Sequence, residues 1–282
     1  MAFMHVGALL GFFTFSWAAL GMAVFLWWVT GGIGICLGYH RYFTHRSYST
    51  PRPVQWLLAV CGCMAGEAGP ISWVAAHRYH HTYSDTDQDP HSPKKGFLWS
   101  HFTWLLGREN FLANYDSYKK YCPDMVKDRV IVFLDKWHLL PVLVLAGLLY
   151  TIGGWPFVVW GIFVRSLMVY HSTWLVNSAS HIWGYRAYKT TDDSRNNWWV
   201  SLLTFGEGWH NNHHAFQRSA RHGFRWWEVD LTYRTIQFLW VLGLASDIHL
   251  PVKKSAAVGL TVPVRDFGQI RVPDAQVPAA SA

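Results

Sequence analysis

Two long stretches without an acidic or basic side chain limit what this chain can fold into. Residues 1–40 and residues 137–164 contain no Asp, Glu, Lys or Arg, and the whole chain is only 15% charged. About a quarter of the residues of an ordinary soluble protein are charged. Helices buried in soluble proteins seldom stay uncharged over such lengths, whereas the hydrocarbon core of a bilayer requires it. The pattern predicts an integral membrane protein.

Each uncharged stretch is too long for one span of about 20 residues and contains a turn signal of small or polar residues. These signals are residues 14–16 (Thr-Phe-Ser) and the Gly153-Gly154 pair. Four transmembrane helices in two hairpins are therefore expected. Because residues 1–13 are short for a helix that rises about 1.5 Å per residue, the first span is either truncated or begins upstream.

The basic residues set the expected orientation. All 24 Lys and Arg residues lie outside the two uncharged stretches, so the positive-inside rule places the other segments and both termini on the cytoplasmic, or stromal, side. The expected fold is all-α, with a cytosolic helical cap on four transmembrane helices. Residues 1–249 form a single domain in this interpretation, and residues 250–282, rich in Pro, Ala and Val, form a loosely ordered tail.

Two features inside the hairpins carry separate expectations. Gly34 and Gly38 place two small residues on one helix face, which favours close helix packing over a widened space for substrate. Arg165 lies beyond the Gly153-Gly154 turn by about 16 Å of helix, and neither hairpin contains an acidic residue to pair with it. We expect Arg165 to face the bundle interior and to bond backbone carbonyls or water; a place beside a substrate channel is the alternative.

Sixteen residues are histidines, and half of them fall into three short motifs. The motifs are H-x-x-x-x-H at His40 and His45, and H-x-x-H-H at two places: His77, His80 and His81, and again His210, His213 and His214. On a helix, positions i, i+3 and i+4 project from one face. Each H-x-x-H-H motif therefore presents a wedge of imidazoles, about 100° wide, that can reach two neighbouring metal ions.

The first motif differs in its spacing. A five-residue step turns a side chain by about 140° on an α-helix, so His40 and His45 are expected to end a span and to bind different metal ions. Asn177 and His181, four residues apart just after the fourth span, share a face that points at the same cytosolic layer. Nine histidines and one amide are more ligands than one ion can use, which predicts two ions.

The residue types narrow the choice of metal. Imidazole suits Zn, Cu, Fe and Ni, so spacing alone leaves the metal open, and the four cysteines show neither zinc-ligand nor disulfide-framework spacing. A nitrogen-rich site that a lipid chain can enter from the bilayer suits oxidation of an unactivated C–H bond, which needs a redox metal and dioxygen. Two Fe ions (Fe2+/Fe3+), with O2 as co-substrate, are favoured. The remaining histidines, including His91, His101, His171 and His222, are interpreted as ordinary core or surface residues.

Five segments resemble one family of membrane enzymes. They are residues 31–47 (GGIGICLGYHRYFTHRS), 69–81 (GPISWVAAHRYHH), 86–91 (TDQDPH), 155–178, and 205–230 (FGEGWHNNHHAFQRSARHGFRWWEVD). Together with the order of the histidine motifs, they resemble the membrane fatty-acyl desaturases, and above all the delta-9 acyl-lipid desaturases of cyanobacteria and their plant relatives. The resemblance covers nearly everything from residue 16 to residue 249.

The resemblance implies a ligand set and a reaction. The iron ligands would be nine histidines, with Asn177 contributing through a water: His40, His45, His77, His80, His81, His181, His210, His213 and His214. The implied reaction removes two hydrogens from adjacent methylenes of a saturated acyl chain and leaves a cis double bond. Dioxygen is reduced to water with two electrons from outside the chain. No catalytic residue beyond the metal ligands is expected.

One departure from the family bears on the form of the substrate. The acyl-CoA desaturases of animals resemble this chain near the second motif, but they carry an Arg-Asp pair where this chain has Ala75 and Ala76. An acyl group on a glycerolipid is therefore favoured, with acyl-CoA as the alternative. Trp73, Lys94 and Lys95 are candidates for docking substrate or electron donor; the two lysines suit an anionic head group or form an ordinary solvated turn.

Electrons are expected from a separate protein, because the sequence contains no haem-binding His-Pro-Gly-Gly motif. The acyl-lipid branch resembles users of ferredoxin, a small acidic iron–sulfur protein, and a net charge of +7 suits an acidic partner. A cytochrome-type donor is the alternative. Membrane lipids are expected around the chain, and nucleic acid is not expected as a partner.

Two other functions share some of these features. A lipid hydroxylase with the same di-iron site would differ in its product. A metal transporter or a bis-histidine haem protein would place its ligands near the bilayer midplane or on facing spans, where this chain has almost no histidine.

Overall fold

Helices form all the regular secondary structure of residues 1–107 and 115–251, the part of the chain that this computed structural model describes. In the first of these segments they are α1 (Ala2–Leu9), η1 (Leu10–Phe13), α2 (Trp17–Trp27), η2 (Trp28–Thr44), α3 (Arg52–Ala65), α4 (Pro70–Tyr83), η3 (Pro93–Lys95), α5 (Phe97–His101) and η4 (Thr103–Leu106). In the second they are α6 (Tyr115–Tyr121), η6 (Met125–Lys127), α7 (Arg129–Lys136), α8 (Leu140–Val158), η7 (Val159–Val164), α9 (Arg165–Asn177), α10 (Ala179–Ile182), α11 (Trp198–Leu203), α12 (His210–Ala215) and α13 (Leu231–Val241). The predicted all-α class is confirmed for these residues, whereas almost all of the predicted tail, residues 250–282, lies outside them.

The first uncharged stretch turns where the sequence predicts a turn. The opening helix ends at Phe13, and the Ser16 hydroxyl accepts the backbone N–H of Ala19 at 3.1 Å, which caps the start of α2. From there α2 and η2 continue as one helix of 28 residues, Trp17–Thr44, which contains an 18-residue window of mean hydropathy 1.9. This helix carries the first histidine motif at its far end.

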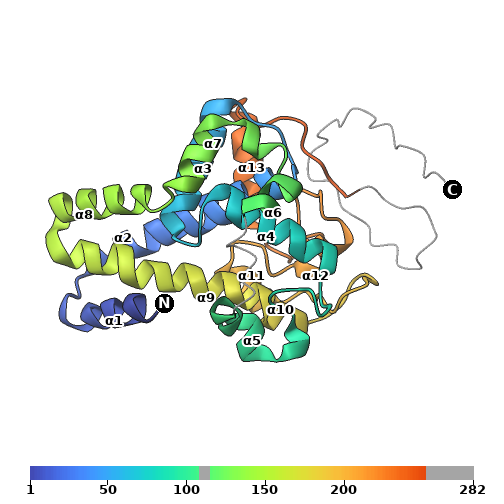
Figure 1. The fold of residues 1–282 in the computed structure, drawn as a ribbon, viewed down its shortest axis with the longest axis horizontal. Coiled ribbons are helices and arrows are strands. Elements are labelled where there is room, and N and C mark those ends of the chain that lie inside the picture. Colours follow the sequence, from blue (N-terminus) through green and yellow to red (C-terminus); the bar gives the residue numbers. More distant parts are fainter. Residues whose placement is uncertain (108–114, 252–282) are drawn as a thin grey trace.

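The second uncharged stretch also breaks at its predicted turn. The helical run Leu140–Ile182 contains 43 residues and includes an 18-residue window of mean hydropathy 2.0. Gly154 interrupts the run with φ 64° and ψ −155°. Only glycine adopts such a conformation easily. In Figure 1, α8 runs to the far left and the chain returns through η7 and α9.

Length and composition of the helices bear on the number of membrane spans. The described residues contain two helices that are long and apolar enough to cross a membrane. A third would be α3 with α4, which are bent by 83° at their junction, while Ala2–Phe13 is apolar but short. The prediction of four spans therefore stays a prediction.

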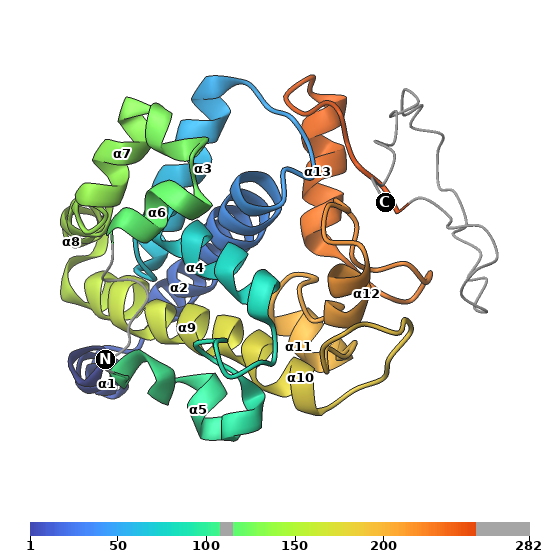
Figure 2. The same ribbon diagram turned by 45° about the vertical axis from the view of Figure 1, so that its right-hand side comes forward.

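Close packing holds the long helix against α3. A Cβ atom on Gly34 would lie 2.5 Å from the carbonyl carbon of Cys61, so only glycine fits there, and a Cβ on Gly38 would lie 3.1 Å from the Cβ of Leu58. The close-packing interpretation of these two glycines is confirmed. In Figure 2 the long helix is viewed nearly end-on, with α3, α4, α9 and α13 around it.

Arg165 is fully buried and bonds backbone carbonyls, as predicted. Its Nη1 donates to the carbonyl of Met64 at 2.7 Å, and its Nε donates to the carbonyl of Gly161 at 2.9 Å. Met64 belongs to the last turn of α3, where carbonyls lack partners within the helix. The guanidinium therefore joins α9 to the end of α3.

Candidate metal centre

Nine histidines from four segments of the chain meet in two adjacent groups. The first cluster is His40, His45, His77, His81 and His213, and the second cluster is His80, His181, His210 and His214. Within each cluster, one donor nitrogen per ring lies within 4.8 Å of every other. The two clusters are neighbours, because the ring centroids of His81 and His214 are 4.7 Å apart. The set equals the nine histidines predicted from the sequence.

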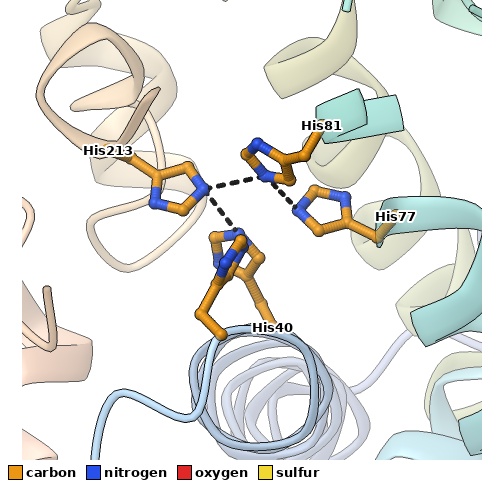
Figure 3. Close-up of side chains that lie close together, drawn as sticks. His40, His77, His81 and His213 are labelled. Atoms are coloured by element: carbon orange, nitrogen blue, oxygen red, sulfur yellow. Dashed lines mark hydrogen bonds between the residues drawn. The ribbon is translucent and has the colours of Figure 1, made fainter. Parts of the chain in front are cut away.

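Each H-x-x-H-H helix serves both clusters, as its spacing predicts. In α4, His77 and His81 face the first cluster and His80 faces the second; in α12 the assignment reverses, since His213 alone faces the first. Figure 3 shows His77 and His81 reaching from α4 toward His213 of α12, above His40. The Nε2 atom of His213 lies 3.1 Å from that of His81 and 3.2 Å from that of His40.

The prediction that His40 and His45 bind different ions is wrong. Both belong to the first cluster, and their ring centroids are 4.8 Å apart. The reason is the helix type: η2 is a π-helix, and the N–H of His45 donates to the carbonyl of His40 at 3.2 Å. Such an i→i+5 turn brings residues five apart onto one side of the helix. The prediction assumed an α-helix, in which the same two residues point in different directions.

The donor nitrogens fit metal ions better than they fit one another. The Nε2 atoms of His40, His81 and His213 cannot all be satisfied by hydrogen bonds with one another, because a neutral imidazole carries only one N–H. Nitrogens that share one ion at about 2.1 Å stand roughly 3 Å apart, as these do. The Nε2 atoms of His45 and His214 are also buried with no hydrogen-bond partner among the described residues.

Electrostatics keep the rings on α12 in the form that binds metal. Burial, followed by the neighbouring histidines, holds the pKa of His210 and His213 well below its ordinary value. Burial lowers the pKa of His214 to about 4, although its hydrogen bond with Asp192 opposes this. These imidazoles are therefore neutral at pH 7, and neutral imidazole is the metal ligand.

Four carboxylates orient the histidines from behind, and the sequence interpretation missed all four. Three of them accept a hydrogen bond from an Nδ1–H, and the fourth, Glu207, lies at ion-pair distance from the Nδ1 atom of His40. Each carboxylate thereby turns the Nε2 atom of its histidine toward the cluster. The pairs are Glu207 with His40 (2.7 Å), Asp89 with His80 (3.0 Å), Asp85 with His181 (3.1 Å) and Asp192 with His214 (2.7 Å). Three of these acids stand within eight residues of a histidine motif, which was the available signal.

Two histidines interpreted as ordinary lie against the clusters. The Nδ1 atom of His222 is 2.9 Å from Glu207, and the His91 ring centroid is 4.4 Å from that of His80. His222 is fully buried, and His91 is nearly so. By contrast, His101 and His171 bond each other at 3.0 Å and belong to neither cluster.

An apolar cavity of about 260 Å³ adjoins the centre. His40, His77 and His210 form part of its wall, and most of the rest is hydrophobic. Trp73 and Asn177, both predicted site residues, line the cavity, and Trp73 stacks on His77 with ring centroids 5.0 Å apart. A space of this kind suits an alkyl chain.

Lys94 and Lys95 lie elsewhere. Both belong to η3 and are exposed, and neither lines the cavity. The Nζ atom of Lys95 lies 5.3 Å from the centroid of the Trp99 ring. Their role in docking stays a prediction.

The fold and the site define a helical protein with helices apolar enough to cross a membrane, in which two adjacent histidine clusters that could each hold a metal ion border an apolar cavity. Comparison with known proteins identifies its family. A family model described as fatty acid desaturase matches residues 11–243. The chain belongs to the fatty acid desaturase family.

Curated relatives extend over most of the chain. The sn-1 stearoyl-lipid 9-desaturase of Anabaena variabilis is 53% identical over 253 residues, which cover 89% of this chain and 92% of that protein. The sn-2 palmitoyl-lipid 9-desaturase of Nostoc sp. (strain 36) is 49% identical, with 86% of each chain covered. The chloroplastic palmitoyl-monogalactosyldiacylglycerol delta-7 desaturase of Arabidopsis thaliana is 48% identical, with 88% of this chain and 67% of that protein covered.

Proposed function

We propose that this protein inserts a cis double bond at the delta-9 position of a saturated acyl chain carried by a membrane glycerolipid. The observation that carries the proposal is the apolar cavity whose wall includes histidines of both clusters. In the overall balance, the acyl chain loses two hydrogen atoms. O2 takes up these two hydrogens together with two electrons and two protons, and two water molecules form. The relatives named as stearoyl-lipid and palmitoyl-lipid 9-desaturases support the delta-9 position and the lipid-linked substrate.

Two iron ions bound by the clusters would supply the oxidising power for C–H cleavage, which no protein side chain provides. The proposed ligands are the nine clustered histidines, with Asn177 reaching the second cluster through a water. The protein itself would orient these ligands through its four carboxylates and exclude water from the cavity. Trp73, stacked on His77, would hold the acyl chain beside the first cluster.

A lipid-linked substrate also agrees with the wall of the cavity. Ala76 lines the cavity and Ala75 is fully buried, so neither position offers a charged group to a coenzyme A moiety. The acyl-CoA substrate is therefore the weaker alternative.

We further propose four membrane spans, with the metal centre and both termini on the cytoplasmic or stromal side. The breaks at residues 14–16 and at Gly154 support two hairpins. The concentration of basic residues outside the hairpins supports the orientation.

An acidic electron donor such as ferredoxin would dock close to the second cluster. Arg186, Lys189 and Arg225 are exposed there. The Arg186 guanidinium donates to the carbonyl of Asp192 at 2.8 Å, and the carboxylate of Asp192 bonds His214. One residue thus separates a basic surface from a proposed iron ligand, a short path for electrons. A cytochrome-type donor would need the same basic surface.

Product and metal analyses test the proposal. Expressed in a host that lacks unsaturated fatty acids, the chain should produce delta-9 cis double bonds in glycerolipids, mapped by mass spectrometry in each lipid class. The purified protein should contain about two Fe per chain and show no haem absorbance. A hydroxylated product would identify a hydroxylase instead, and one haem per chain would refute the metal centre.

A further inference from the structure

The two clusters differ in how many of their histidines are backed by a carboxylate. In the second cluster, three of four rings have an aspartate on Nδ1: His80, His181 and His214. In the first cluster, only His40 of five rings has an acidic partner in the described part of the chain. There the Nδ1 atoms of His81 and His213 are buried with no hydrogen-bond partner among the described residues.

The single acid behind the first cluster is paired with a buried cation, Arg41, which also pairs with Asp230. Glu207 accepts a hydrogen bond from Nε of Arg41 at 3.0 Å, and Nη2 of Arg41 lies at ion-pair distance from the same oxygen, at 2.9 Å. The Arg41 side chain is fully buried. Glu207 also shares its second oxygen with His222. Arg41 therefore offsets part of the negative charge that Glu207 brings to the first cluster.

The three aspartates behind the second cluster have no such cation. Within residues 1–107 and 115–251, no Lys or Arg side chain forms an ion pair with Asp85, Asp89 or Asp192. Their remaining hydrogen bonds come from backbone N–H groups and a hydroxyl: for example, the N–H of Asp193 donates to Asp85 at 2.6 Å. All three carboxylates are buried, with exposed fractions of 2%, 0% and 9%.

A carboxylate at Nδ1 of a metal-binding histidine changes both the affinity of the site for a metal ion and the charge state of the ion that it favours. A carboxylate on Nδ1 raises the basicity of the ring and strengthens its bond to metal, commonly by 10–100-fold in affinity. Uncompensated negative charge a few ångströms from an ion also favours its more highly charged state, more so in a buried site where screening is weak.

We infer that the two metal sites are unequal: the second cluster binds its ion more tightly and stabilises Fe3+ more than the first cluster does, because Asp85, Asp89 and Asp192 back its ligands. The inference rests on the proposed di-iron function. The three aspartates are positioning residues, since they act through the histidines and not on the substrate. An Fe3+ ion would therefore be held by the second cluster in preference to the first, next to the basic surface where the electron donor would dock.

Metal affinity is the first test, and it does not depend on turnover. The metal-free full-length protein in lipid nanodiscs is titrated anaerobically with Fe2+ by equilibrium dialysis. Wild type should show one tight and one weaker site. Asp192→Asn, which keeps the shape and removes the charge, should weaken only the tight site by about 10–100-fold, and Asp192→Glu should recover part of that loss.

Neighbouring exposed aspartates provide matched controls. Asp193→Asn and Asp87→Asn each remove one negative charge, one or two residues away from Asp85, Asp89 or Asp192. Both side chains are exposed, and neither contacts a clustered histidine in the described part of the chain. Neither variant should change either affinity. Equal effects of Asp192→Asn and Asp193→Asn would overturn the inference, because they would show a general surface-charge effect.

Redox state is the second test. Mössbauer spectra of protein loaded with 57Fe and oxidised by one electron should show Fe3+ at one of two distinct sites, and Asp192→Asn should move the potential of that site to a more positive value. Two equivalent sites in wild type would overturn the inference and leave the proposed function intact. Binding of fewer than two Fe2+ ions by wild type would refute the proposed di-iron centre itself.

Discussion

The Nδ1 atom of His40 lies 2.7 Å from Oε2 of Glu207, and the other oxygen of that carboxylate bonds Arg41. Glu207, in the turn before α12, thus contacts both the proposed metal ligand His40 and the next residue of η2, the buried Arg41. Asp230 accepts from the same guanidinium at 3.0 Å. The network joins the end of the long helix to the last third of the chain, and the first cluster depends on it.

Neutralising Glu207 should therefore affect folding as well as metal binding. Glu207→Gln leaves the buried Arg41 with one carboxylate fewer, and breaking a buried ion pair commonly costs about 3–5 kcal/mol. We expect a lower midpoint of thermal unfolding in detergent and loss of metal from the first cluster. Asp193→Asn, an exposed change of equal charge, is the control. An unchanged midpoint for Glu207→Gln would show that the network does not stabilise the fold.

His181→Ala should abolish desaturation as completely as a substitution within the three motifs. The Nε2 atom of His181 lies 3.0 Å from that of His210 in the second cluster, so its loss removes one of four proposed ligands. Double bonds formed in the expression host and Fe per purified chain are the measurements. His138→Ala, outside both clusters, should keep both at the wild-type level. Retained activity in His181→Ala would limit the centre to the motif histidines.

Gly34→Ala should destabilise the protein by overpacking. The added Cβ would meet the backbone of Cys61 at 2.5 Å, and forced repacking of this kind costs about 1–3 kcal/mol. Gly21→Ala, in the same long helix, has no atom within 4 Å of the new Cβ and should be neutral or slightly stabilising. Thermal unfolding in detergent compares them. Equal midpoints for the two variants would contradict the close contact between η2 and α3.

Arg165→Met should destabilise the end of α3. The substitution leaves the carbonyl of Met64 without its donor in a buried place, at a cost of about 1–3 kcal/mol. Arg165→Lys keeps a donor and should lie between Met and wild type. Because Arg165 does not line the cavity, the specific activity of folded protein should change little in either variant. A selective loss of activity without destabilisation would instead indicate a role beside the substrate.

Several features of the site follow from local chain geometry, and these were predictable. The division of each H-x-x-H-H motif between two clusters needs only the α-helical positions of its residues. His181 was found because it follows Asn177 by one helical turn at a membrane exit. The turns near Ser16 and at Gly154 follow from the length that an apolar helix needs to cross a bilayer.

Tertiary structure decided the rest. His40 and His45 share one cluster because packing selects a π-helix for η2, and helix type is not encoded in the spacing of the two histidines. Four carboxylates act through the histidine ring that each one contacts: Asp85, Asp89, Asp192 and Glu207. The sequence alone does not show which acidic residue contacts which histidine. Spacing determined the proposed ligands of this protein, because a helix repeats locally; only long-range contacts decided their carboxylate partners, and with them the proposed difference between its two histidine clusters.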